Sequence, residues 1–213
     1  MKKLFIYDFD GTIGDTRLTI VTTLQATLHH YGFENLSNDT CAATIGLTLE
    51  DAFQSMVEGL SRDKAIEMAA YYRIIFEDNK ALLRPQPFPH VIDTIRAVNE
   101  RGIIQTIASS RGNQSLMDFV NDMQLTPYIS MVVGANDVVN PKPHPEAVIT
   151  IMERMKVSAK DTLVIGDMPF DIMMGANAHC DTCGVTYGNA TRQQLADSGA
   201  THIIDDFQQL LEL

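Results

Sequence analysis

The chain has few cysteines, few basic residues and no long run of apolar residues, and each scarcity excludes a class of protein. The 213 residues include three cysteines, Cys41, Cys180 and Cys183. This number is too small, and odd, for a disulfide framework. The 16 Lys and Arg against 27 Asp and Glu give a net charge of −11, which argues against nucleic acid as a partner because basic clusters hold phosphate backbones. No stretch reaches the roughly 20 apolar residues that span a bilayer, so we expect no membrane partner.

Two short segments suggest secretion or redox chemistry, and their neighbours argue against both. The N-terminus carries two lysines and a short apolar run, as a signal peptide does, but Asp8 and Asp10 interrupt the run too early. Cys180 and Cys183 have the CxxC spacing, yet a second cysteine pair for a zinc site is missing and the following segment is predicted as a strand. We therefore expect a cytoplasmic protein and assign the CxxC spacing no metal or redox role.

Apolar runs of strand length alternate along the chain with segments of helical periodicity. This alternation, with continuously apolar strands, predicts an α/β fold: a doubly wound parallel sheet covered by helices on both faces. The chain is long enough for one such core and a smaller appended unit. The predicted strands are Leu4–Tyr7, Ile103–Ala108, Ile129–Val133, Thr162–Ile165, Cys183–Thr186 and His202–Ile204. The predicted helices of the core are 90–99, 114–123, 145–155, 168–178 and 190–197.

Residues 14–83 break the alternation, because they contain helical patterns and no convincing strand. The helical patterns cover Leu18–Tyr31, Leu49–Leu60 and Ala65–Asp78, and residues 40–46 form a loop or at most a short helical turn. Pro85, Pro87 and Pro89 follow, and such spacing favours an extended linker. We predict an all-helical cap domain at 14–83, inserted into a core domain made of 1–13 and 84–213.

Polar side chains follow four of the predicted strands at the point where each strand ends. They are Asp8 and Asp10, then Ser109 and Ser110, then Lys142, and finally Asp167 and Asp171. The carboxyl ends of parallel strands converge on one crevice of an open sheet, so we expect these side chains to meet. A turn, a helix cap or an exposed loop explains each feature alone. Their order and their common place at strand ends favour a shared site.

The chemistry that these residue types suit is phosphoryl transfer. A cluster of acids is best tolerated around a hard divalent cation, and Mg²⁺ favours carboxylate oxygens and water. Asp8 can attack phosphorus and form an aspartyl phosphate. Asp10 can protonate the leaving oxygen and then activate water. Ser109 offers a hydroxyl to the phosphate oxygens, and Lys142 offers a positive charge.

The motifs at these positions resemble those of the haloacid dehalogenase superfamily, in particular its phosphoglycolate phosphatase-like branch with a helical cap. They are DFDGT at 8–12, Ser109, Lys142 within NPKPHPE, and GDMPFD at 166–171. The resemblance covers nearly the whole chain. It implies a Mg²⁺-dependent phosphomonoester hydrolase with Asp8 as nucleophile and Asp10 as acid and base.

The same resemblance implies a role for each neighbouring residue. It makes Ser109 and Lys142 stabilisers of the phosphate and of the intermediate. The implied metal ligands are Asp8, Asp167 and, through its backbone carbonyl, Asp10, while Asp171 orients the metal site. The residues implied to fix the loops and bind phosphate are Gly11, Thr12, Ser110 and Arg111.

Within the predicted cap, the loop at 44–48 resembles the substrate-specificity loop of that branch. Gly46 and Thr48 are therefore candidate substrate-binding residues, although a turn in which Thr48 caps the next helix explains them equally well. His29 and His30 are adjacent and so do not face one another on a helix, and we predict no metal site there.

Several functions remain open at the level of sequence. The leading substrate is a small phosphorylated metabolite, with phosphoglycolate first, and the protein is expected to be a monomer or a homodimer. A sugar-phosphate mutase uses the same acids but returns the phosphoryl group to its substrate, and a pyrophosphatase or nucleotidase of the same family fits as well. A phospho-acceptor signalling module also places acids, a hydroxyl and a lysine on a parallel sheet, but the helical insert and the GDMPFD segment disfavour it.

Overall fold

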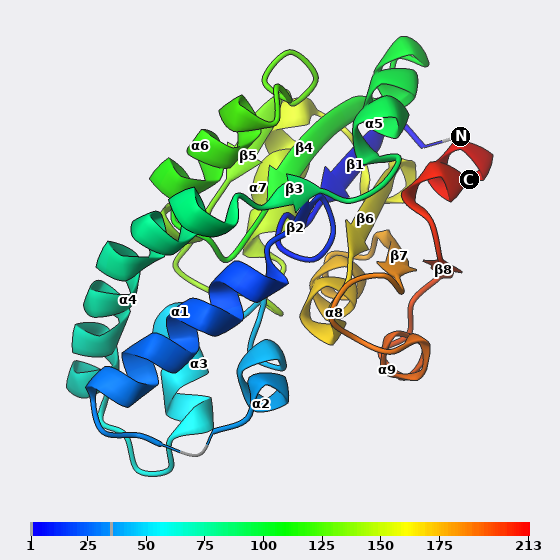
Figure 1. Ribbon diagram of the computed structural model, residues 1–213. Helices are drawn as coiled ribbons and strands as arrows, with labels where there is room; N and C mark the ends of the chain where they lie inside the picture. Colours follow the sequence, from blue (N-terminus) through cyan, green and yellow to red (C-terminus); the bar gives the residue numbers. More distant parts are fainter. Residues whose placement is uncertain (1, 35) are drawn as a thin grey trace.

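A parallel sheet of six strands forms the core within residues 2–34 and 36–213, the part of the chain that the computed structural model describes (Figure 1). The strand order is β5-β4-β1-β6-β7-β8. In register, Tyr7 of β1 lies between Ile107 and Ile165 of its two neighbours. The predicted α/β fold is confirmed. The strands are β1 Leu4–Tyr7, β4 Ile104–Ala108, β5 Met131–Val133, β6 Thr162–Gly166, β7 Asp181–Val185 and β8 His202–Ile204.

The central strand β1 is apolar throughout because helices cover both faces of the sheet. Leu4 and Ile6 belong to a buried cluster with residues of α7 (Glu146–Met155) and α8 (Pro169–Asn177). Phe5 and Tyr7 point to the opposite face, where the ring of Tyr7 lies 5.5 Å from that of Phe207. Each such buried side chain contributes about 1.5–3 kcal/mol. The other core helices are α5 Val91–Glu100, α6 Asn113–Asp122, α9 Arg192–Asp197 and the short 3-10 helices at Ala135–Asp137, Ala159–Asp161 and Phe207–Glu212.

The remaining helices lie together beside the carboxyl edge of the sheet, at the lower left of Figure 1. They are α1 Arg17–His30, α2 Asn38–Ala42, α3 Leu49–Met56 and α4 Arg62–Leu83. The long helix α4 packs against both α1 and α3. Leu24, Phe53 and Met68 are fully or almost fully buried between these helices. We refer to the group of α1 to α4 as the cap.

The two chain crossings between core and cap pair with each other. β2 (Gly14–Asp15) and β3 (Gln86–Pro87) form a short antiparallel ladder, with Gly14 opposite Pro87. The sequence predicted only an extended linker here, because strands of two residues show no alternation that a pattern could detect. The pairing holds the entry and the exit of the cap side by side.

Several element boundaries differ from the predicted ones for local reasons. Helix α4 is longer than predicted: the Ser61 side chain accepts the Lys64 N–H at its start, and it runs on to Leu83, two residues before Pro85. Helix α3 ends at Met56 rather than Leu60, three residues before the turn at Gly59. Residues 38–42 form the short helix α2, within the range of outcomes expected for that segment.

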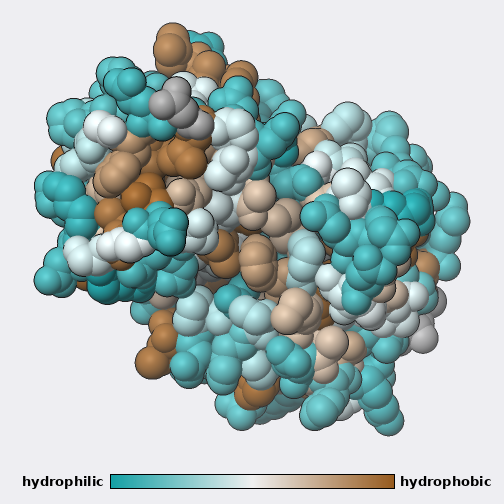
Figure 2. Space-filling view, turned by 90° about the horizontal axis from the view of Figure 1, so that it is seen from below, coloured by the Kyte–Doolittle hydropathy of each residue, from teal (hydrophilic) through white to brown (hydrophobic). Residues whose placement is uncertain are grey.

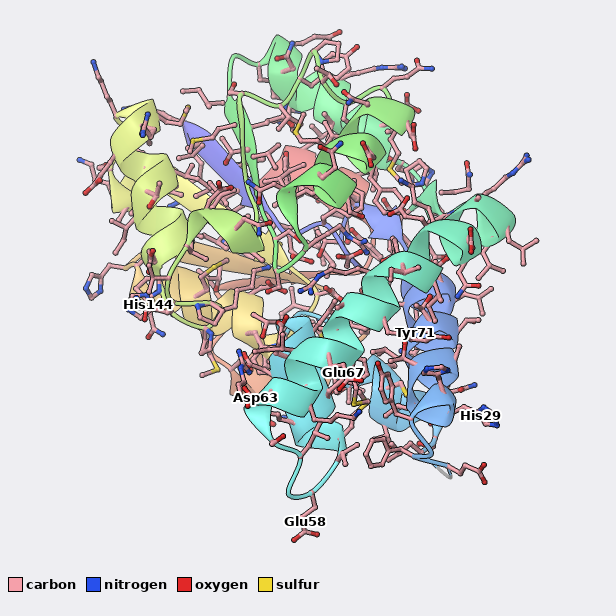
Figure 3. The ribbon with its side chains drawn as sticks, turned by 90° about the vertical axis from the view of Figure 1, so that its left-hand side faces the viewer. His29, Glu58, Asp63, Glu67, Tyr71 and His144 are labelled. Atoms are coloured by element: carbon pink, nitrogen blue, oxygen red, sulfur yellow. The ribbon has the colours of Figure 1, made fainter. Side chains whose placement is uncertain are left out.

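No helix among the described residues is long and apolar enough to cross a membrane. The structure places the cysteines and histidines singled out in the sequence as follows. Burial raises the pKa of the Cys180 thiol to about 11 and that of Cys183 to about 12, so both stay protonated at neutral pH. His29 projects outward from α1, whereas the ring of His30 stacks on Tyr71 at 4.1 Å (Figure 3).

Candidate active site

The side chains expected to meet at the carboxyl edge of the sheet do meet there. Asp8 directly follows β1, and the Lys142 ammonium donates to it at 2.5 Å and to Asp171 at 2.7 Å. Ligand atoms of Asp8, Asp167 and Asp171 all lie within 4.8 Å of one another. Ser109 follows β4, and its hydroxyl accepts the Arg111 N–H at 3.2 Å. The convergence of strand ends predicted from sequence therefore creates one compact, buried, charged site.

Burial controls the protonation of this site. It raises the pKa of Asp8, against the opposing pull of Lys142. It also raises the pKa of Asp167 to about 7, helped by the charge of Asp171. Burial disfavours the charged form of Lys142 too, but Asp171 and Asp8 more than compensate and raise its pKa, so the ammonium persists.

This donor set fits a divalent cation. Three buried acids cluster near a single ammonium, and all the offered ligand atoms are carboxylate oxygens. Hard cations such as Mg²⁺ prefer oxygen ligands, and a bound cation would offset the excess negative charge. The cluster of Asp8, Asp167 and Asp171 therefore suits a divalent metal ion.

Asn189 holds Asp167 in place, and sequence reasoning missed it. Both its backbone N–H and its side-chain amide donate to Oδ2 of Asp167, at 2.7 and 2.8 Å. Thr12 reaches the other oxygen at 3.4 Å. The available signal was positional: Asn189 lies in the loop after β7, so it follows the carboxyl end of a strand as the other site residues do.

Two glycines allow the loops to close on Asp167. Gly11 has a φ of +90°, and a Cβ there would lie 2.2 Å from Oδ2 of Asp167. A Cβ at Gly188 would lie 2.3 Å from the Cβ of the same aspartate. Gly11, which the resemblance placed among phosphate-loop residues, thus shapes the slot that contains the acid.

Arg111 binds the carboxylate of Asp10. Its Nη2 and Nε donate to the two oxygens of Asp10 at 2.6 and 3.1 Å, and the Thr16 hydroxyl adds a bond of 2.7 Å. The guanidinium lies 4.7 Å from the ring of Phe76 in the cap and 4.9 Å from that of Phe119 in the core. The Asp10 side chain is thus not one of the three clustered acids, and its expected metal contact is its backbone carbonyl.

A cavity of about 840 Å³ extends from Asp8 toward the cap. Its lining includes Gly46 and Thr48, the candidate residues of the cap loop, and Ser110 donates to the Gly46 carbonyl at 2.6 Å. Thr48 also caps α3, where it accepts the Asp51 N–H at 3.3 Å, so the helix-cap interpretation is confirmed. In the view from below, the surface between the cap on the left and the core on the right is mixed, with hydrophobic residues next to hydrophilic ones (Figure 2).

The chain matches the family model described as haloacid dehalogenase-like hydrolase over residues 5–185. It is 30% identical to a protein named probable phosphatase IndB from Dickeya dadantii, over 99% of this chain and 93% of that protein. It is 26% identical to pyrophosphatase PpaX of Oceanobacillus iheyensis, covering 99% of this chain and 96% of that one. It is 31% identical to phosphoglycolate phosphatase of Salmonella choleraesuis, covering 66% and 54%.

The fold is similar to a crystal structure described as a haloacid dehalogenase-like hydrolase from Bacteroides fragilis. The TM-score is 0.92 at 25% identity, with 99% of this chain and 100% of that chain covered. The protein therefore belongs to the haloacid dehalogenase-like hydrolase family. It is an enzyme of the phosphatase class in that family. These matches confirm the resemblance to haloacid dehalogenase phosphatases that its motifs indicated.

Proposed function

We propose that the protein is a Mg²⁺-dependent phosphomonoester hydrolase that works through an aspartyl phosphate on Asp8. One observation carries the proposal: Asp8 lines the cavity, in contact with Lys142 and clustered with two further buried acids. A carboxylate aimed into a cavity beside a fixed cation suits nucleophilic attack on phosphorus.

The reaction takes two balanced steps. A carboxylate oxygen of Asp8 attacks phosphorus, the bond from phosphorus to the alcohol oxygen breaks, and that oxygen takes a proton from Oδ2 of Asp10, while Oδ1 of Asp10 keeps its hydrogen bond to Arg111. Water then attacks the same phosphorus and gives its proton to Asp10, while the bond from phosphorus to Asp8 breaks. The products are the alcohol and inorganic phosphate, and both aspartates regain their starting forms.

The surrounding residues position the reacting groups. Lys142 is bonded to Asp8 and offsets its charge, and the Ser109 hydroxyl, which lines the same cavity as Asp8, would donate to a phosphate oxygen. Asp8, Asp167 and the Asp10 carbonyl would hold Mg²⁺, which when bound supplies positive charge to the phosphate oxygens. Asp171 is bonded to Lys142 and to the Met168 N–H at 3.0 Å, which suits it to orient the site.

Trapping the intermediate tests this proposal. Protein mixed with a phosphomonoester and Mg²⁺ is quenched in acid and digested, and mass spectrometry locates any phosphoryl group. We expect it on Asp8, and we expect excess chelator to abolish both the label and the release of inorganic phosphate. Undiminished phosphate release in chelator, or turnover with the label on another residue, would contradict the proposal.

The same measurements separate the alternative functions. A sugar-phosphate mutase would carry the label but release little inorganic phosphate and require a bisphosphate activator. A phospho-acceptor module would keep the label long after the substrate is removed. Phosphoglycolate and pyrophosphate, after which relatives are named, belong in the first substrate panel.

A further inference from the structure

The cavity above Asp8 contains more acidic than basic side chains. Its acids are Asp8, Asp10, Glu50, Glu77 and Asp118, and its bases are Arg73 and Arg111. An anionic group on the far side of a substrate would need one of these two arginines as a partner. Whether either arginine is available therefore decides which leaving groups the cavity accepts.

Arg111 is already fully engaged. Its Nε and Nη2 bind Asp10, and its Nη1 donates to the Ser115 hydroxyl at 3.1 Å. Only 8% of its side chain is exposed, between the two aromatic rings described above. To bind a substrate anion it would have to abandon the buried carboxylate of Asp10, which is costly.

Arg73 has its own acid partner. Its Nη2 donates to Glu50 at 2.9 Å, and Glu50 lines the same cavity. Arg62, which lines a smaller neighbouring pocket, is likewise bonded to Asp51 at 2.6 Å. The cations near the cap wall are thus offset by acids of the protein itself.

Apart from these charged residues, Glu77 and the hydroxyls of Thr44 and Thr48, the cap wall is apolar. The rings of Tyr72 and Phe76 stack on each other, with centroids 5.6 Å apart and planes at 23°. A carboxylate or phosphate placed against this wall would lose its hydration without gaining a cation. The wall consists mainly of Ile20, Leu24, Ile45, Leu47, Leu49, Ala52, Tyr72 and Phe76.

We infer that the substrate is a phosphomonoester of an uncharged alcohol with an apolar or aromatic portion. This class excludes phosphoglycolate and pyrophosphate as preferred substrates, because their leaving groups carry a second anion. The inference rests on the proposed function, since it concerns the alcohol released from the phosphorus that Asp8 attacks. The cavity volume of about 840 Å³ leaves room for an alcohol far larger than glycolate.

A matched pair of substrates tests the inference. Benzyl phosphate and 4-carboxybenzyl phosphate have the same ester linkage and differ by one remote carboxylate. We expect kcat/KM to be roughly 10- to 100-fold higher for benzyl phosphate, because the carboxylate has no cation to meet. Phosphoglycolate and pyrophosphate are measured beside them and are expected to fall below benzyl phosphate.

A charge-changing variant sharpens the test. Glu50→Gln removes the acid that pairs with Arg73. The ratio of kcat/KM for benzyl phosphate to kcat/KM for 4-carboxybenzyl phosphate should therefore fall by about threefold. Glu58→Gln is the matched control, because Glu58 projects away from the molecule at the loop between α3 and α4 (Figure 3). This control removes the same charge and should leave the ratio unchanged.

Each outcome bears on the inference. The inference is overturned if the two benzyl esters have equal kcat/KM values. It is also overturned if the enzyme prefers the carboxylated ester, phosphoglycolate or pyrophosphate. In either case the proposed function still stands, provided that Asp8→Asn is inactive. Hydrolysis of none of the four compounds overturns both. An identical change of ratio in Glu50→Gln and Glu58→Gln would show that overall charge, and not the pairing of Arg73, sets the preference, which also contradicts the inference.

Discussion

On the core side of the cavity the lining is polar or charged, whereas on the cap side it is mostly apolar and its arginine is paired with an acid. Asp10 exemplifies the core wall, with the Arg111 guanidinium on its two carboxylate oxygens. Phe76 exemplifies the cap wall, stacked on Tyr72. Under the proposed function, this difference means that the core carries out the chemistry and the cap selects the leaving group.

The two walls also differ in how they are built. The groups of the core wall follow the ends of parallel strands, so the sheet fixes their spacing. The cap wall consists of helices joined to the core through the paired crossings β2 and β3. Arg111 links the two, because it binds Asp10 and also contacts Phe76. Substitutions in one wall should therefore affect rate, and those in the other should affect selectivity.

The largest effect is expected from Asp8→Asn in the core wall. Loss of the nucleophile should lower kcat by about a thousandfold or more for every substrate alike. The thermal midpoint of the metal-free protein should stay the same or rise, since burial raises the pKa of Asp8 and the folded state gains little from its charge. Phosphate release and calorimetric melts measure the two quantities.

Asp197→Asn provides the matched control, because Asp197 is exposed at the end of α9 and loses the same charge. It should retain full activity. Appreciable turnover by Asp8→Asn, or loss of activity only for some substrates, would contradict the division between the walls.

The second prediction concerns how the free energy of unfolding of the metal-free protein depends on pH. Burial and Asp171 raise the pKa of Asp167 to about 7, so the folded state holds this proton more tightly than the unfolded chain, whose aspartates titrate near 3.9. The resulting stabilisation is complete below about pH 4 and is lost as pH rises through about 7. The loss is on the order of a few kcal/mol, measurable by denaturant melts in chelator.

Asp167→Asn isolates the contribution of this cluster, because groups outside Asp8, Asp167 and Asp171 titrate equally in both proteins. The stability difference between the two proteins should change sharply between about pH 4 and about pH 8. Added Mg²⁺ should restore stability at the higher pH in the parent protein more than in the variant. A pH-independent difference would show that Asp167 does not hold its proton in the folded state.

Arg111→Lys is expected to have an intermediate effect, since it weakens the contact between the walls. Lysine cannot reproduce the two-point grip on Asp10 or the stacking between Phe76 and Phe119. We expect kcat to fall by roughly 10- to 100-fold for all esters, with a smaller change in KM. Steady-state kinetics on the benzyl pair measures both.

Arg73→Lys is the matched control in the cap wall, where the partner is the single oxygen contact to Glu50. It should change kcat by less than about threefold. A larger fall in kcat for Arg73→Lys than for Arg111→Lys would reverse the roles that we assign to the two arginines.

The core could be predicted from the sequence much further than the cap wall. Strand positions follow from apolar runs, and the rule that parallel strand ends converge brings Asp8, Lys142 and Asp167 together across the chain. The hydrogen bonds of Asn189 and the pairing of Arg111 with Asp10 depend on loop conformation, which apolar periodicity does not encode. Sequence therefore predicted which groups meet, but not which partner each one takes.

The cap helices were predicted, but their inward faces were not. Helix α4 shows weak amphipathic patterning, because one side faces α1 and α3 and another faces the cavity, as Tyr72 and Phe76 do. Exposed Ile74 and Leu82 on the same helix blur the pattern further. The apolar character of the substrate wall thus emerges only from packing.

The smallest effect is expected at His90, remote from both walls. His90 begins α5 with a φ of +62°, the left-handed region that favours glycine, and its ring binds Asp206 at 2.7 Å. His90→Ala loses the exposed hydrogen bond to Asp206 and keeps the unfavourable φ, whereas His90→Gly loses the same hydrogen bond and relieves the φ. His90→Gly should therefore be more stable than His90→Ala by about 1 kcal/mol, with kinetics unchanged in both. Denaturant melts of the two variants measure the difference. A glycine variant less stable than the alanine variant would show that packing around His90, and not its backbone conformation, determines the cost.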